Sequence, residues 1–448
     1  MYTSETIFVS IASYRDLELL PTLKDMLRQA ANPENIHIAV CWQDDQPLDI
    51  FNREGFIPEG QRTLQELNVA AFRYRQARID IINVHYFSSQ GACWARSLAE
   101  SLYEGEHYFL QIDSHCRFIP NWDREMILML KQLSKFSPLP IISSYPPAYT
   151  PGEDEESSKK TYVSRPTFRE YNEQGIPMFG SVSFNASQPV RGSYLAAGFI
   201  FTLGEFVRTV PNDPQIFFAG EEIAMAVRAF TYGYDVYHPH KPLLWHFYQR
   251  DEHNKIWGDH NDQAKSQGEI EKAWWERDRI SKKRVRTLLG LENDPLIDLG
   301  PYTTGNQRTL KQFEFQTGLW LRNGTALPEV IENEKISYFA VPPADENAWR
   351  ECHRAFYRKT LTLNASDYVG EDAEMDVLYI NVYSKQNELL YKRMLDLVEL
   401  SALRVASDSN KLALELQFKT ASQVKPSVIR LGKWSNNSGW GAVTEEAW

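Results

Sequence analysis

Residues 108–115 of this 448-residue chain read YFLQIDSH, and they decide how the first part of the chain is expected to fold. The apolar run ending at Ile112, bounded by polar residues, predicts a buried strand. Asp113, Ser114 and His115 follow at its carboxyl end. Because open α/β sheets bind ligands beyond the carboxyl ends of their strands, Asp113 and His115 are candidate ligands of a metal ion. The triplet alone is weak evidence, because a D-x-H pattern arises by chance about once in every few chains of this length.

Strands and helices alternate on both sides of this stretch. Apolar runs at 7–11, 36–42 and 79–84 each predict a strand, and helical patterns follow the first of these runs and Gly91. A further buried strand is expected over 194–202. This β-α-β rhythm predicts an α/β domain with a doubly wound, mostly parallel sheet.

The pattern of predicted secondary structure changes in the last third of the chain, where several runs have β character and helical patterns are few. We therefore expect three parts. Residues 1–290 form the α/β domain, residues 291–335 form a linker or connecting segment, and residues 336–448 form a smaller all-β domain of unknown role.

Composition excludes several classes of protein. The formal net charge of −11 argues against nucleic acid as the main partner, because phosphate binding requires a basic face. The four cysteines show no CxxC spacing, which predicts buried thiols in a reducing compartment rather than a zinc site. The first residues lack the pattern of a signal peptide, and no apolar run reaches about 18 residues. We expect a cytoplasmic protein without a membrane-spanning segment.

The third metal ligand is sought among the histidines, of which the chain has ten. Five of these lie between His238 and His260. His246 follows an apolar run directly, as Asp113 does, so we prefer it to His240. One carboxylate and two imidazoles suit Mn²⁺ better than Ca²⁺, and Mg²⁺ remains possible. The predicted metal ligands are Asp113, His115 and His246.

Glu221 and Glu222 form a second polar centre at the start of a predicted helix. Acidic residues in a first helical turn complement the helix dipole, so a purely structural role is credible. Paired carboxylates near a metal-bound phosphate can also orient an acceptor hydroxyl or stabilise a developing positive charge. We predict both as catalytic residues.

Further residues at strand ends are candidates for contact with a phosphorylated substrate. Arg96, after Gly91, and Arg15, after the first strand, can each approach a diphosphate. Asp44 follows the second strand, where a doubly wound fold meets a base or ribose. The chain contains no dinucleotide fingerprint, P-loop or nucleophile elbow. The predicted substrate-binding residues are Ser13, Arg15, Asp44, Arg96, Asp113 and Ser114.

Four stretches together resemble a known family. They are FVSIASYRDLELLPTLKDML at 8–27, QGACWARSLAESLYEGEHYFLQIDSHCRFIPNWD at 90–123, SYLAAGFIFTLGEFV at 193–207 and FFAGEEIAMAVRAFTYGYDVYHPHKPLLWH at 217–246. This set resembles the GlcNAc-transferase family of UDP-sugar-dependent glycosyltransferases, whose best-known members attach α-linked N-acetylglucosamine to a hydroxyproline of a cytoplasmic protein. A more distant similarity is to the polypeptide N-acetylgalactosaminyltransferases.

The resemblance implies a GT-A-type fold, a UDP-sugar donor and retention of the anomeric configuration. It also implies that Asp113, His115 and His246 hold manganese. Glu221 matches the glutamate of the family's second motif, whereas Glu222 stands where the galactosaminyltransferases have asparagine, so its role is open.

These observations predict a glycosyltransferase that moves N-acetylglucosamine, or a related sugar, from a UDP-sugar to a hydroxyl of a protein or glycan acceptor. Two alternatives remain at this point. A metal-dependent phosphohydrolase would use the same Asp and His residues but would need a second metal ion. A carbohydrate-binding protein would act through its C-terminal domain.

Overall fold

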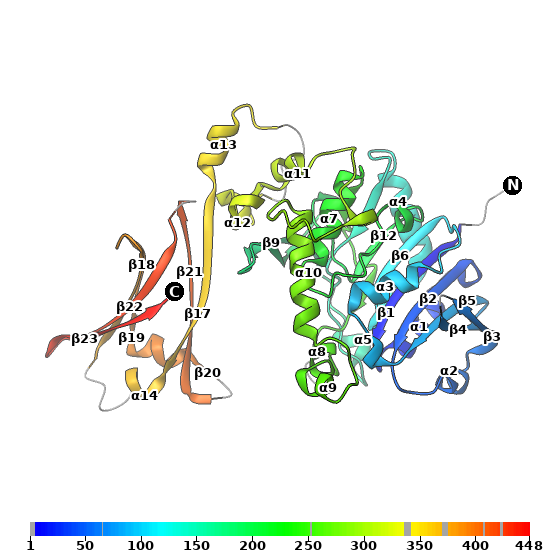
Figure 1. Cartoon of the computed structure of the whole chain (residues 1–448), viewed down its shortest axis with the longest axis horizontal. Coiled ribbons are helices and arrows are strands. Elements are labelled where there is room, and N and C mark those ends of the chain that lie inside the picture. Colours follow the sequence, from blue (N-terminus) through cyan, green and yellow to red (C-terminus); the bar gives the residue numbers. More distant parts are fainter. Residues whose placement is uncertain are drawn as a thin grey trace. The chain divides into compact units, whose positions relative to one another are not determined.

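The computed structural model describes residues 5–64, 66–250, 253–335, 342–369, 375–405, 408–421 and 424–448. The chain divides into two compact units, each with its own sheets (Figure 1). The first unit covers Met1–Thr317 with Lys335–Pro342, and the second covers Gly318–Glu334 with Pro343–Trp448.

The segment expected to connect the domains, 291–335, divides between these two units. Helix α11 (Leu310–Thr317) belongs to the first unit, and α12 (Pro328–Ile331) belongs to the second.

The first unit is built on a ten-stranded mixed sheet. In spatial order its strands are β11 (Val190–Gly192), β13 (Asp235–His238), β8 (Pro140–Ser143), β12 (Phe199–Leu203), β6 (Tyr108–Asp113), β1 (Ile7–Tyr14), β2 (Ile36–Gln43), β5 (Ala77–Val84), β4 (Leu67–Tyr74) and β3 (Ile57–Leu64). Strands β6, β1, β2 and β5 run parallel, so their carboxyl ends meet at one edge of the sheet. Strand β12 lies antiparallel to β6.

The central strands are apolar because both faces of the sheet are covered. Every residue of β2 is buried, and so are the first five of both β1 and β6. Helix α3 (Ala92–Glu100) packs on β1 and β2, whereas α4 (Trp122–Leu133) packs on β8. Helix α1 (Leu19–Gln29) contributes Leu23 and Met26 to the same hydrophobic core.

Three further elements complete the neighbourhood of the predicted ligands. Strand β7 (Cys116–Phe118) pairs with β14 (Leu244–His246) as a separate two-stranded ladder. Helix α7 (Glu221–Thr231) begins after Gly220, and α10 (Trp274–Leu288) packs against α7.

The second unit consists of two antiparallel sheets. One has the order β15 (Leu319–Trp320), β16 (Thr325–Ala326), β17 (Arg354–Asn364), β21 (Asp408–Ala421) and β20 (Arg404–Val405); the other has β19 (Leu389–Asp396), β18 (Val377–Ser384), β22 (Pro426–Ser435) and β23 (Gly439–Ala447). Leu378 of β18 and Leu414 of β21 belong to one core cluster, so residues from both sheets share a hydrophobic interior. The predicted class is confirmed: a mixed α/β sheet precedes a smaller β-rich part.

Among the described residues, no helix combines the length and the apolar character needed to cross a lipid bilayer.

Candidate active site

A cavity of about 510 Å³ opens at the carboxyl ends of β1 and β6. Its walls include Asp113 and His246, which were predicted as metal ligands, together with Arg96 and both glutamates of the pair Glu221–Glu222. Most of the predicted site residues therefore meet in one cavity, although Asp113 and His246 lie 133 positions apart in the chain.

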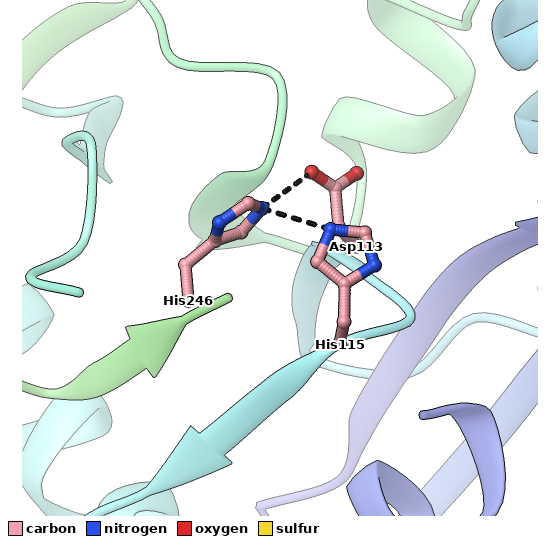
Figure 2. Close-up of side chains that lie close together, drawn as sticks. All are labelled: Asp113, His115 and His246. Atoms are coloured by element: carbon pink, nitrogen blue, oxygen red, sulfur yellow. Dashed lines mark hydrogen bonds and ion pairs between the residues drawn. The ribbon is translucent and has the colours of Figure 1, made fainter. Parts of the chain in front are cut away.

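The structure brings Asp113, His115 and His246 together (Figure 2). The Nε2 atom of His246 lies 3.1 Å from Asp113 Oδ2 and 3.1 Å from His115 Nε2. One possible ligand atom from each residue lies within 4.8 Å of the other two. Two imidazole nitrogens and a carboxylate oxygen facing one point suit a divalent transition-metal ion.

Asp16 holds His115 in place from behind. Its Oδ2 atom accepts hydrogen bonds from His115 Nδ1 at 2.8 Å and from Ser114 Oγ at 2.5 Å. Arg250 Nη2 lies 3.0 Å from the same oxygen. A carboxylate bonded to Nδ1 fixes the tautomer that leaves the Nε2 lone pair free for a metal ion. This arrangement is a further reason why the cluster fits a metal site.

Neighbouring donors and charges favour an ionised Asp113, and burial favours a neutral His246. Burial would raise the pKa of Asp113, but the hydrogen bond from His246 and the charge of Arg96 lower it well below its ordinary value. Burial lowers the pKa of His246, partly offset by Asp113. These are the protonation states in which both groups can ligate a metal ion.

Arg96 connects the cluster of Asp113, His115 and His246 to Glu221. It lies on α3, and its Nη2 donates to Asp113 Oδ1 at 2.8 Å while its Nη1 forms an ion pair with Glu221. Gly91 allows α3 to begin here: its φ is 119°, and a Cβ atom at this position would lie 2.6 Å from the carbonyl oxygen of Phe217. The close approach brings the start of α3 against the segment that leads into α7.

Glu222 has a different set of partners. It accepts hydrogen bonds from Tyr145 Oη at 2.5 Å and from the backbone N–H of Ala197 at 3.1 Å. Burial raises its pKa, although these two donors oppose the shift. Both glutamates are therefore held by donors, and neither presents an unpaired carboxylate to the cavity.

Three predicted substrate-binding residues lie outside the cavity lining. The Oγ atom of Ser13 is buried. Arg15 donates to Asp259 at 3.0 Å and lies over the ring of Tyr86, 4.3 Å from its centroid. Asp44 accepts hydrogen bonds from the next two backbone N–H groups and closes its own turn. Their contact with a substrate stays a prediction.

The sequence interpretation missed several residues of this site. Asp16 is absent from the predicted site residues, yet its Oδ2 atom accepts a hydrogen bond from His115. Tyr145 and Gly198 carried no signal of their own. A Cβ atom at Gly198 would lie 2.7 Å from Asp113 Oδ2, so this glycine makes room for the carboxylate.

A family model described as Glycosyltransferase (GlcNAc) matches residues 6–56 and 53–320, well over half of the chain. The chain belongs to this glycosyltransferase family. The match confirms the resemblance from which the GT-A-type fold was predicted. Membership supports sugar transfer as the reaction and gives no support to the phosphohydrolase alternative.

Among solved structures, the fold is similar to three described as follows. "Crystal structure of GalNAc-T7 with UDP, GalNAc and Mn2+" shares 15% identity and a TM-score of 0.41, covering 69% of this chain and 54% of the other. The present chain thus spans about half the length of that protein. "Crystal structure of S. aureus TarS 1-349" shares 10% identity, with a TM-score of 0.32 and coverages of 63% and 71%. "Crystal structure of S. aureus TarS" shares 11%, with a TM-score of 0.33 and coverages of 99% and 77%. A search among curated proteins gave no match.

Proposed function

We propose that this glycosyltransferase moves N-acetylglucosamine, or a closely related sugar, from a UDP-sugar to an acceptor hydroxyl with the help of a divalent cation. The observation that carries the proposal is the convergence of Asp113, His115 and His246 on one wall of the cavity that also contains Arg96 and the glutamate pair. The acceptor belongs to a protein or a glycan, and a cytoplasmic location stays a prediction.

The donor set favours Mn²⁺, with Mg²⁺ as the second choice, because two of the three ligand atoms are imidazole nitrogens. Asp113 Oδ2, His115 Nε2 and His246 Nε2 would hold the ion. A bound divalent cation neutralises the negative charge that develops on a diphosphate leaving group.

The protein's own side chains prepare the site for an anionic leaving group. The guanidinium groups of Arg96 and Arg250 flank the metal cluster and contact two of its members. Such groups bind phosphate oxygens through charge-assisted hydrogen bonds. Glu222, held by Tyr145 and Ala197, contributes negative charge to the same cavity, where a sugar carbon that becomes oxocarbenium-like would be stabilised.

We further propose that the anomeric configuration is retained. Inversion needs an unpaired carboxylate that takes a proton from the nucleophile on the face opposite the leaving group. Glu221 is ion-paired with Arg96, and Glu222 is hydrogen-bonded by Tyr145 and by the backbone. An acceptor hydroxyl that attacks from the face of the departing diphosphate needs neither as a free base. The anomeric proton coupling in the product, compared with that in the donor, tests this point.

The test of the main proposal is a donor screen for UDP release, with and without Mn²⁺. The expected result is release from UDP-GlcNAc, loss of activity with a chelator and recovery with Mn²⁺. H246A should lower turnover at least about 100-fold, since removal of a ligand weakens both metal binding and charge neutralisation. H240A is the matched control, because His240 lies outside the cavity lining and the cluster. Full turnover and unchanged metal dependence in D113A would show the assignment to be wrong.

A further inference from the structure

A group of aromatic side chains lies on the outer face of the four-stranded sheet of the second unit. Side chains alternate along β18: Leu378, Ile380 and Val382 are fully buried, so Tyr379 and Asn381 point to the opposite face. Figure 1 shows β18, β22 and β23 side by side in this sheet. The outer face thus presents its own set of side chains, separate from the core.

Three rings form the centre of this face. Trp440 of β23 has its ring centroid 4.8 Å from that of Tyr379 and 5.2 Å from that of Trp434. The residue Trp440 is 59% exposed, although burial of a tryptophan is strongly favourable. We call Tyr379, Trp434 and Trp440 the aromatic platform.

Gly432 is the reason the platform can form. It pairs with Tyr379 on one side and with Val443 on the other, so it stands between β18 and β23 on the same face. A Cβ atom at Gly432 would lie 3.2 Å from the Trp440 ring, closer than ordinary van der Waals contact. The indole therefore crosses β22 over a position without a side chain and reaches Tyr379.

Hydrogen-bonding groups of both charges border the platform. Asn381 pairs across the sheet with Lys392 and with Arg430. Lys392 Nζ lies 5.5 Å from the centre of the Tyr379 ring, and Arg430 donates to Glu445 at 2.7 Å. Arg430 and Glu445 neutralise each other as a pair, and Lys392 adds one positive charge, so the border offers both hydrogen-bond donors and acceptors to a polar ligand.

One polar atom in this border is unsatisfied. Asn381 Oδ1 is buried without a hydrogen-bond partner among the described residues. Such an atom is destabilising unless a donor reaches it. It lies on the same strand and face as Tyr379, two residues away.

We propose that the aromatic platform is a carbohydrate-binding site, distinct from the catalytic cavity. A pyranose has an apolar face of C–H groups and a rim of hydroxyls. The aromatic rings can pack against the apolar C–H face. Asn381, Lys392 and the Arg430–Glu445 pair can form hydrogen bonds with the hydroxyls. The rings are tilted by 53° and 73° relative to one another, which fits a single glycan chain rather than a flat crystalline surface. The site would hold a glycan on the second unit while the first unit performs sugar transfer.

The test uses the full-length chain and two soluble probes, chitotetraose and maltohexaose, with binding measured by calorimetry in the absence of UDP-sugar and metal. We expect saturable binding of at least one probe. W440A should weaken it at least tenfold, because it removes the central ring. G432A should weaken it to a smaller extent by displacing that ring, and N381A tests the polar border without removing any ring.

The matched control is F136A, which deletes another exposed ring, 79% exposed, from the first unit. Its affinity should equal that of the unaltered chain. Circular dichroism and the unfolding midpoint check that W440A is folded. Absence of binding to either probe at millimolar concentration would overturn the proposal, and so would equal affinity in folded W440A. Concentration-dependent self-association that W440A abolishes, without glycan binding, would assign the platform to a second copy of the chain instead.

Discussion

Replacing Asp16 by Asn tests whether the carboxylate behind the metal cluster determines metal affinity. Asp16 contacts no atom that would ligate the ion directly; it acts through His115 Nδ1 at 2.8 Å. Its side chain is only 1% exposed, and asparagine has nearly the same size. The substitution removes the charge and preserves the packing. Because an amide can donate to Nδ1, it also permits the tautomer that carries its proton on Nε2, the atom facing the cluster.

The expected effect follows from these contacts. Loss of a carboxylate that supports a ligating histidine weakens metal binding about 10- to 100-fold. That range corresponds to about 1.4–2.8 kcal/mol in binding free energy. The loss of negative charge also leaves Arg250 without the carboxylate that it contacts at 3.0 Å. We therefore expect D16N near the upper end of this range, with maximal turnover at saturating Mn²⁺ much less affected.

The assay is UDP release as a function of Mn²⁺ concentration, together with calorimetric Mn²⁺ binding. D25N is the matched control: Asp25 is 3% exposed and accepts from the backbone N–H of Phe118 at 2.8 Å, but it does not contact the cluster. D25N should lower the free energy of unfolding and leave the Mn²⁺ midpoint unchanged. If D16N and D25N shift that midpoint equally, the carboxylate of Asp16 has no special role and the reasoning fails.

Three further substitutions test other contacts. Y145F removes the hydroxyl that donates to Glu222 at 2.5 Å, and we expect kcat/KM for UDP-sugar turnover to fall about tenfold and the free energy of unfolding to fall by about 1–3 kcal/mol, because the buried carboxylate loses a donor. G198A places a Cβ atom 2.7 Å from Asp113 Oδ2 and should lower both turnover and Mn²⁺ affinity. If G198A matched the unaltered chain in both turnover and Mn²⁺ affinity, the close approach would be contradicted. H37Q tests a buried ion cluster: burial would lower the pKa of His37, but the two carboxylates hydrogen-bonded to it raise the pKa above its ordinary value of 6.5. The stability from this histidine is complete below about pH 6.5 and is lost as pH rises through the folded-state pKa, so urea unfolding of H37Q should show a weaker decline between pH 6 and pH 9.

Elements buried on both faces were predictable because nothing competes with hydrophobicity there. The strands β1, β2 and β6 were predicted from their apolar runs. The hairpin of β3 and β4 was missed, because every residue of β3 except the last is exposed and its sequence has no apolar alternation. Strand β3 is held by backbone pairing with β4, and the side-chain pattern of its sequence does not indicate this pairing.

The strand predicted over 194–202 begins only at Phe199. Residues 196–198 are not part of strand β12, and two of them contact the site instead. The N–H of Ala197 donates to Glu222, and Gly198 lies against Asp113. Local hydrophobicity carries no information about such contacts. For the same reason the sequence indicated the cluster and the glutamate pair, which carry charged side chains, but not Tyr145, which acts through a single hydroxyl.

The position of the third candidate ligand depends on the register of one short ladder. Strands β7 and β14 pair so that His246 lies opposite Cys116, directly after His115 in the chain, and the two imidazole centroids are 4.5 Å apart. A shift of the pairing by one residue would put an aromatic neighbour of His246 in the position that the imidazole now occupies. The pair Leu244–Phe118, each only 1% exposed, fixes the register in the core. The apolar run that made His246 the preferred candidate ligand in the sequence is therefore the same run that fixes the position of His246 in the structure.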